Sequence, residues 1–281
     1  MNALELLYKG SINLKQKKIA SFRLDAEILL SKVLKKKREE VLINLDQKIC
    51  LKHILKFNNL IQRRSQNEPV AYIIKEKEFW SKNFLVNRNT LIPRPETELM
   101  VEKLVEIYRG KSISILDIGT GSGCILISLL IELNHSRGIG IDISKKAIFI
   151  AKKNAKKHGK HLDIKFLNKS LSSNFTRKFD LIVSNPPYIK SKDIRNLTDD
   201  IKKHEPRIAL DGGNDGLDLI KKVIYKTKNI LKFKGMLALE IGNEQNKKVS
   251  KILLKNNFKI EYTIKDYKDN VRCLISTYLN N

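Results

Sequence analysis

Apolar residues recur at helical spacing in the first part of the chain. Ser21 is a candidate helix N-cap, and the apolar residues after it follow the spacing i, i+4, i+7, i+8, i+11 and i+12. They are Phe22, Ala26, Leu29, Leu30, Val33 and Leu34. A second stripe consists of Cys50, Ile54, Phe57 and Ile61. We therefore predict a small helical bundle over residues 1–70.

The helical spacing stops in residues 71–95, which we expect to be a linker. Two short apolar runs flank the polar residues 81–83, a pattern that is typical of a short β-hairpin. From Pro95 the sequence predicts a helix to about residue 108, since proline and acidic residues suit a first helical turn.

Strand and helix patterns alternate over residues 96–281. The expected strands are 113–117, 138–142, 179–183 and 236–241, and the expected helices between them are 123–133, 144–158 and 217–231. This alternation is typical of an α/β fold with a doubly wound, mostly parallel sheet. The last two apolar runs, 258–263 and 271–279, predict an antiparallel pair that closes the sheet.

The chain carries a large excess of basic residues. Its 281 residues include 55 Lys and Arg against 30 Asp and Glu, which gives a net charge of +25. Such a charge favours association with nucleic acid or ribonucleoprotein. The lysines are spread through every segment, however, so a diffuse, solvated charge explains them better than a dedicated groove for nucleic acid.

The cysteines and the hydropathy exclude several classes of protein. Cys50, Cys124 and Cys273 lie far apart, without a C-x-x-C pair or a histidine cluster, so neither a zinc site nor a disulfide framework is indicated. We expect buried free thiols and no metal. Residues 1–18 lack the pattern of a secretory signal, and the longest apolar stretch, 125–133, is too short to span a bilayer. We therefore expect a cytoplasmic protein without a membrane partner.

A glycine-rich loop, Gly119-Thr120-Gly121-Ser122-Gly123, follows the first strand of the alternating region. Its glycines allow a sharp turn and a close approach of the backbone to a ligand. The spacing differs from the G-x-G-x-x-G of dinucleotide-binding folds, which makes a pyrophosphate less favoured.

Asp142 ends the next expected strand, where its carboxylate is placed to accept hydrogen bonds from both hydroxyls of a ribose. The alternative is that Asp142 caps the following helix, a role for which Ser144 competes. The glycine loop and the acid together predict a nucleoside-type ligand.

The segment Asn185-Pro186-Pro187-Tyr188 follows the expected strand 179–183. Its two prolines remove two backbone donors and fix two φ angles, so the loop is stiff and rich in carbonyl acceptors. Asn185 adds a side-chain oxygen, and Tyr188 adds an aromatic face. These features match a planar group that carries –NH2, although Asn-Pro and Pro-Pro are also common at turns.

The glycine loop and Asp142 together resemble the class I S-adenosylmethionine-dependent methyltransferases. The resemblance implies that residues 119–123 hold the methionine part of S-adenosylmethionine and that Asp142 holds its ribose. In these enzymes a residue after the third strand meets the adenine amino group, and here that segment lacks an acid, which leaves Asn168 as the candidate acceptor. Ser170 and Asn185 complete the expected cofactor contacts.

Further segments narrow the resemblance to one family. The motif 185–188 is typical of methyltransferases that modify the nitrogen of a planar amino group, in glutamine amides or in nucleic-acid bases. The segments that look like those of the release factor glutamine methyltransferases are 22–27, 68–73, 91–98 and 205–210. This resemblance extends over nearly the whole chain.

The resemblance implies both an architecture and an activity. The architecture is a seven-stranded Rossmann-like methyltransferase domain over residues 96–281, with a small all-α domain over residues 1–70 that docks the release factor. The activity is N5-methylation of the glutamine in the Gly-Gly-Gln motif of peptide chain release factors, with S-adenosylmethionine as donor and S-adenosylhomocysteine as product. Release factors are the expected partners, an indirect association with the ribosome is open, and we expect a monomer.

We expect Asn185 and Pro186 to act on the substrate directly. The side-chain oxygen of Asn185 and the carbonyl of Pro186 would each accept one N–H of the amide, while Tyr188 packs on the amide plane beside Pro187. Glu205 either braces a loop or faces the substrate. The alternatives are an amino-methyltransferase acting on adenine in nucleic acid or on a ribosomal-protein glutamine, and a binding module without catalysis.

Overall fold

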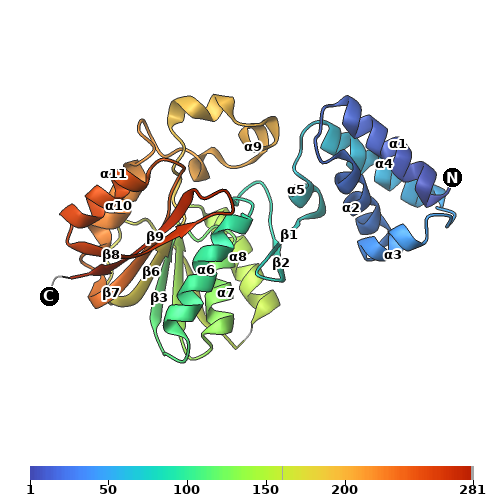
Figure 1. Ribbon diagram of the computed structural model, residues 1–281. Coiled ribbons are helices and arrows are strands. Elements are labelled where there is room, and N and C mark those ends of the chain that lie inside the picture. Colours follow the sequence, from blue (N-terminus) through green and yellow to red (C-terminus); the bar gives the residue numbers. More distant parts are fainter. Residues whose placement is uncertain (160, 280–281) are drawn as a thin grey trace. The chain divides into compact units, whose positions relative to one another are not determined.

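The computed structural model describes residues 1–159 and 161–279, which form two compact units (Figure 1). The first unit consists of Met1–Glu76 and Thr198–His204. The second consists of Lys77–Leu197 and the chain from Glu205 onward.

The first unit is helical. Its helices are α1 (Ala3–Gln16), α2 (Phe22–Leu34), α3 (Arg38–Ile43), α4 (Leu51–Ser65), α5 (Val70–Ile74) and α9 (Asp199–His204). The two predicted stripes fold as α2 and α4, which confirms both helices. Cys50 is the exposed N-cap residue of α4, so the prediction of a buried thiol is wrong at this position; Cys124 and Cys273 are buried.

Helix α1 is missing from the sequence prediction because both of its faces carry apolar residues. Leu6 is buried in the core of the unit, whereas Leu4 and Tyr8 are exposed. Gly10 allows close packing against α4, since a Cβ at this position would lie 2.7 Å from Cζ of Phe57. The spacing of apolar residues along α1 therefore gives no single stripe.

A buried ion pair joins α2 to α4. Arg64 Nε lies 2.7 Å from Asp25 Oδ2, and the two side chains are only 9% and 7% exposed. Ser21 Oγ donates a second hydrogen bond to the same carboxylate oxygen. Because loss of either partner would leave an unpaired buried charge, the pair constrains how the two helices pack.

The second unit contains, within the described residues, a seven-stranded sheet in the order β5-β4-β3-β6-β7-β9-β8. Its strands are β3 (Ser114–Ile118), β4 (Arg137–Asp142), β5 (Asp163–Asn168), β6 (Phe179–Ser184), β7 (Leu231–Glu240), β8 (Phe258–Lys265) and β9 (Val271–Tyr278). Strands β3 to β7 pair in parallel, and β9 is antiparallel to both β7 and β8. The predicted Rossmann-like sheet and its antiparallel closure are confirmed.

Helices cover both faces of this sheet (Figure 1). The helices are α6 (Pro95–Tyr108), α7 (Cys124–Glu132) and α8 (Lys145–His158) on one face, and α10 (Asp218–Thr227) and α11 (Asn246–Lys255) on the other. Successive residues of β3 enter different cores: Ile115 packs with α6, α7 and α8, and Leu116 packs with α10 and α11. Every residue of β3 is buried, as expected for a central parallel strand.

Short elements complete the unit. Strands β1 (Glu76–Phe79) and β2 (Lys82–Leu85) form the predicted hairpin. The 3-10 helices η1 (Ser191–Asn196) and η2 (Arg207–Ala209) follow β6. Across the described part of the chain, none of the helices combines the length and apolar character needed to cross a membrane.

Candidate active site

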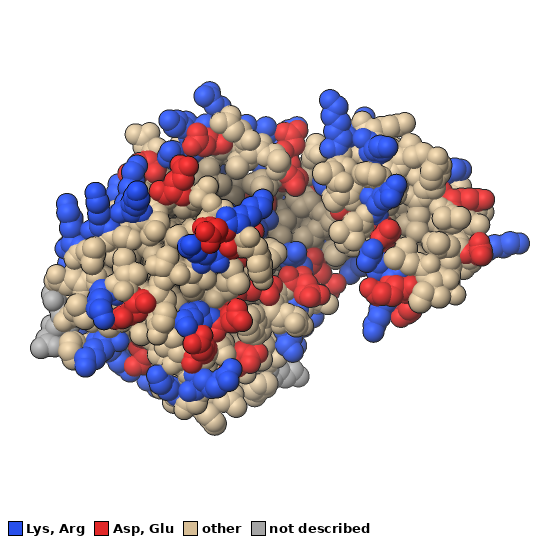
Figure 2. Space-filling view, viewed as in Figure 1, with Lys and Arg blue, Asp and Glu red and all other residues tan. Residues whose placement is uncertain are grey.

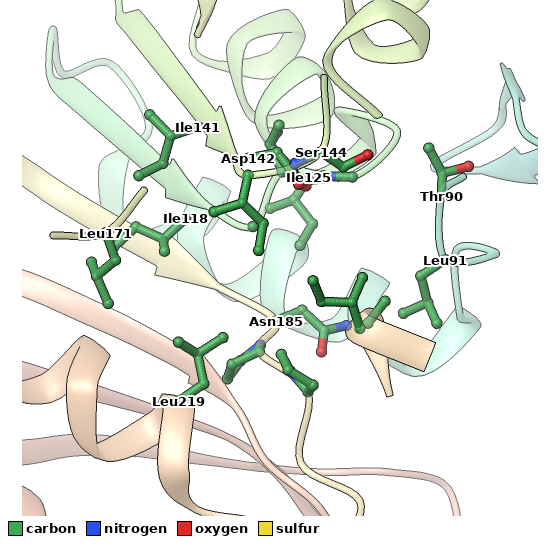
Figure 3. A pocket seen from close by; sticks show the side chains of 18 of the residues that line it. Thr90, Leu91, Ile118, Ile125, Ile141, Asp142, Ser144, Leu171, Asn185 and Leu219 are labelled. Atoms are coloured by element: carbon green, nitrogen blue, oxygen red, sulfur yellow. Dashed lines mark hydrogen bonds between the residues drawn. The ribbon is translucent and has the colours of Figure 1, made fainter. Parts of the chain in front are cut away.

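The carboxyl ends of β3, β4 and β6 meet at one edge of the sheet, because Ile118 pairs with both Ile141 and Ser184. A cavity of about 550 Å³ lies at this edge, and Figure 3 shows part of its wall. The predicted site residues in this wall are Gly119, Thr120, Gly121, Ser122, Asp142, Ser170, Asn185, Pro186 and Pro187. Gly123 and Tyr188 lie outside it.

The glycine loop presents its backbone to the cavity. Gly119 and Gly121 have φ angles of +75° and +56°, a region that glycine occupies without strain. A Cβ at Gly119 would meet no atom within 4 Å, so this position faces open space. Gly123 has a different role, since it is the N-cap residue of α7 and a Cβ there would lie 2.9 Å from Cζ of Phe166.

Asp117 is a buried acid just before the loop that the sequence pattern left without a role. Thr120 Oγ1 donates a hydrogen bond of 2.6 Å to Oδ2, whereas Oδ1 has no partner among the described residues. Burial raises the pKa of this carboxyl to about 7. An unpaired oxygen at this depth suits a cationic group, and its signal in the sequence is an acid in the strand that leads into the glycines.

Asp142 is held in place by the backbone on both sides. Its Oδ2 accepts a hydrogen bond of 3.0 Å from the N–H of Gly121, and its Oδ1 accepts one of 2.8 Å from the N–H of Ser144. Ser144 Oγ in turn accepts from the N–H of Ala147, so Ser144 provides the side-chain cap of α8. Burial raises the pKa of Asp142. The carboxylate is thus fixed in the cavity wall with lone pairs left for a ligand.

Asn185 projects from the end of β6 into the cavity wall (Figure 3). Its Nδ2 lies 3.5 Å from Thr97 Oγ1 on α6. Tyr188 is directed elsewhere: its hydroxyl donates a hydrogen bond of 3.3 Å to Glu240 Oε1, and burial raises its pKa. Gln245 Nε2 donates to the carbonyl of Tyr188 at 3.0 Å, which holds the backbone of the loop.

Two protein-family models match the chain. The model described as Methyltransferase small domain matches residues 95–269, and the one described as PrmC N-terminal domain matches residues 5–74. A release factor glutamine methyltransferase of Buchnera aphidicola subsp. Schizaphis graminum is 44% identical over 250 residues, which cover 89% of this chain and 90% of that protein. The chain belongs to the release factor glutamine methyltransferase family. The resemblance stated from the sequence is confirmed.

A longer relative and a solved structure are also similar to this chain. A bifunctional methyltransferase of Rickettsia felis is 37% identical over 305 residues, which cover 98% of this chain but 58% of that protein. The chain therefore spans somewhat more than half of that relative. A methyltransferase from Pyrococcus furiosus is 17% identical with a TM-score of 0.55, covering 79% of this chain and 100% of that chain. This second likeness shows the fold.

As a release factor glutamine methyltransferase the chain is an enzyme whose methyl donor is S-adenosylmethionine, as predicted. The residues of the cavity fit this donor. Asp142 offers carboxylate oxygens to a ribose, and the open backbone at Gly119 admits the methionine part. Asp117, whose Oδ1 has no partner among the described residues, lies behind this wall. When bound, the donor supplies a methyl group on a positively charged sulfur.

The expected contact between Asn168 and the adenine amino group stays a prediction. Asn168 is not part of the cavity wall, and its Nδ2 donates hydrogen bonds of 2.9 Å to the carbonyls of Asp142 and Ile143. It therefore braces the loop that carries the acid. Ile143 and Leu171 line the wall instead, and Ile143 is 58% exposed. Their apolar faces, beside Ser170, suit a flat aromatic ring.

Glu205 braces the opposite wall of the cavity. Its Oε2 accepts a hydrogen bond of 3.2 Å from the N–H of Ile92, and its Oε1 pairs with the guanidinium of Arg94. Arg94 lines the cavity, whereas Glu205 lies behind it and is buried. Of the two roles that the sequence left open, the structure shows the bracing role.

Proposed function

We propose that this family member transfers the methyl group of S-adenosylmethionine to the side-chain amide nitrogen, N5, of the glutamine in the Gly-Gly-Gln motif of peptide chain release factors. One observation carries the proposal. Asn185 and Pro186, which can accept hydrogen bonds from a planar –NH2 group, line the same cavity as the glycine loop and Asp142. The name of the Buchnera relative, release factor glutamine methyltransferase, supports the choice of substrate.

The chemistry requires orientation of the substrate. An amide nitrogen is a poor nucleophile because its lone pair is delocalised into the neighbouring carbonyl group. Asn185 Oδ1 and the Pro186 carbonyl would each accept one N–H, which turns the nitrogen lone pair toward the methyl group. The same two oxygens face the positive charge that develops on the nitrogen, and a stiff Pro186-Pro187 backbone sets them in advance. The nitrogen would form a bond to the methyl carbon as the bond between that carbon and sulfur breaks, and it would then release one proton to water.

Tyr188 takes part in this scheme through its hydroxyl. The hydrogen bond to Glu240 and the contact of its carbonyl with Gln245 hold the loop in which Asn185 and Pro186 lie. Its stacking on the substrate amide stays a prediction.

The activity is tested by offering labelled S-adenosylmethionine and purified release factor to the full chain. We expect label in the release factor, and Asn185→Ala should lower kcat on the order of 100-fold with little change in cofactor affinity. Asn229→Ala, which changes an exposed asparagine after α10, is the matched control and should keep full turnover. Label that goes to bare RNA or DNA and is lost at moderate salt would favour the nucleic-acid alternative.

We propose that the first unit docks the release factor through an exposed apolar surface. On α1, Leu4, Tyr8 and Ile12 are exposed and share one helical face at the spacing i, i+4 and i+8. On α4, which packs against α1, Leu51 and Leu55 are exposed at the spacing i and i+4. Exposed apolar residues grouped in this way are typical of protein interaction sites.

The docking proposal is tested by charge substitution. Tyr8→Lys should raise the KM for release factor about tenfold, which corresponds to about 1.4 kcal/mol of lost contact, and leave kcat and cofactor affinity unchanged. Ile43→Lys is the matched control, because Ile43 is also exposed but lies on α3. An unchanged KM for both Tyr8→Lys and Leu55→Lys would contradict the proposal. The ribosome association, the monomeric state and the cytoplasmic location stay predictions.

A further inference from the structure

Glu240, at the end of β7, is a buried carboxylate behind the proposed substrate site. It is only 3% exposed and lies outside the cavity wall. Its two oxygens have different partners: Thr97 Oγ1 donates a hydrogen bond of 2.6 Å to Oε2, and the Tyr188 hydroxyl donates one of 3.3 Å to Oε1. Three segments of the chain, α6, the loop after β6 and the end of β7, therefore meet at this carboxylate.

The direction of these hydrogen bonds determines what Thr97 can do. A hydroxyl has one proton, and the short contact to the carboxylate engages it, so Thr97 Oγ1 can only accept further hydrogen bonds. The neighbour at 3.5 Å is the –NH2 group of Asn185. The contact thus holds the amide nitrogen of Asn185 on the side of Thr97.

The orientation of this amide has chemical consequences. An asparagine side chain is nearly symmetric in shape, and a rotation by half a turn exchanges its acceptor for a donor. The proposed substrate is itself an –NH2 group, so a rotated Asn185 would place donor against donor. With its nitrogen toward Thr97, Asn185 leaves its oxygen for the cavity that it lines.

We infer that Thr97 and Glu240 are positioning residues that fix the Asn185 amide with its oxygen toward the substrate nitrogen. This inference rests on the proposed function. Asn185 donates to Thr97, and Thr97 donates to Glu240. The charge of the carboxylate strengthens the hydrogen bond from Thr97, and linked hydrogen bonds polarise one another. Burial raises the pKa of Glu240 to about 6, against the hydrogen bonds from Thr97, Tyr188 and Asn185 and the charge of Arg272, which lower it. These partners favour the ionised carboxylate, which accepts the hydrogen bond from Thr97.

The test removes the hydroxyl without changing the shape of the side chain. Thr97→Val should lower kcat for release factor about tenfold, the factor for one hydrogen bond of about 1.4 kcal/mol, with unchanged cofactor affinity by calorimetry. Thr97→Ser keeps the hydroxyl and should restore most of the turnover. Thr227→Val is the matched control, because this buried hydroxyl bonds to the carbonyl of Ile224 in its own helix.

A double-mutant cycle separates positioning from a general structural role. If Thr97 acts through Asn185, then Thr97→Val should cost little in a chain that already carries Asn185→Ala. A full tenfold loss in that background would overturn the inference, as would a Thr97→Ser chain that is as slow as Thr97→Val.

A spectroscopic measurement tests the orientation without any turnover. The side-chain amide signals of Asn185, identified by their loss in Asn185→Ala, should exchange with solvent about tenfold more slowly in the wild type and Thr97→Ser than in Thr97→Val. Equal exchange in all three chains would overturn the inference. Slow exchange in a protein that does not methylate release factor would keep the orienting role of Thr97 and contradict the proposed substrate instead.

Discussion

Replacing Asp142 with asparagine tests how the cofactor is held. The two carboxylate oxygens accept backbone hydrogen bonds of 3.0 Å from Gly121 and 2.8 Å from Ser144. Asparagine has one side-chain oxygen, so its –NH2 group would face one of these two N–H donors in either orientation. The substitution therefore disturbs the contact to the glycine loop or the start of α8, and it also removes the charge offered to the ribose.

The expected size of the effect comes from the hydrogen bonds that a ribose would lose. A hydrogen bond to a charged group contributes about 1.5–3 kcal/mol. Loss of one such bond corresponds to a rise in the dissociation constant of about 10- to 150-fold. Contacts made by the unchanged residues of the glycine loop should leave weak but measurable binding.

Titration calorimetry with S-adenosylmethionine measures the effect on the full chain. Asp163→Asn is the matched control, because Asp163 is exposed at the first residue of β5, at the other end of the strands, and the change in net charge is the same. We expect wild-type affinity for this control. A dissociation constant for Asp142→Asn within about twofold of the wild type would refute the ribose role.

Three further predictions concern the raised pKa of Asp117, the buried ion pair of Asp25, and the contact between Glu205 and Arg94. The free energy of unfolding in urea should fall as the pH rises from about 4 to about 7, because burial raises the pKa of Asp117 to about 7 and so disfavours its charged form in the folded chain; Asp117→Asn should lack this part of the pH dependence. Asp25→Ala should lower the free energy of unfolding in urea by about 3–5 kcal/mol, since it leaves Arg64 buried and unpaired; a loss below about 1 kcal/mol would contradict this. Glu205→Gln should raise the KM for release factor about fivefold, because Arg94 loses its ion pair and is held less firmly in the cavity wall. Steady-state kinetics should show little change in the KM for S-adenosylmethionine.

The fold follows from the sequence wherever a local pattern determines the local structure. The apolar residues Ile115, Leu116 and Ile118 before the glycine loop mark the buried strand β3, and the stripe ending in Ile61 gives α4. Helix α1 could not be found in this way, because exposed Leu4 and Tyr8 hide its buried stripe. The short helices after β6 are six residues or fewer, which is too short for a periodic signal.

The parts of the site that could be predicted are those where glycine or proline determines the backbone conformation. The glycine loop and the prolines after Asn185 led directly to the cavity wall. Thr97 and Glu240 could not be paired from the sequence, because they are 143 positions apart and meet only through the order of the strands. Asn168 was assigned to adenine on its position alone, and only the folded loop shows that its nitrogen is used to hold the backbone.

The most direct test of the central claim is mass spectrometry of the Gly-Gly-Gln peptide from release factor incubated with the full chain and S-adenosylmethionine. We expect one added methyl group, located on the glutamine side chain by fragmentation and missing when Asn185→Ala replaces the wild type. An unmodified glutamine in the presence of measured cofactor binding, or a methyl group elsewhere in the release factor, would contradict the proposed reaction.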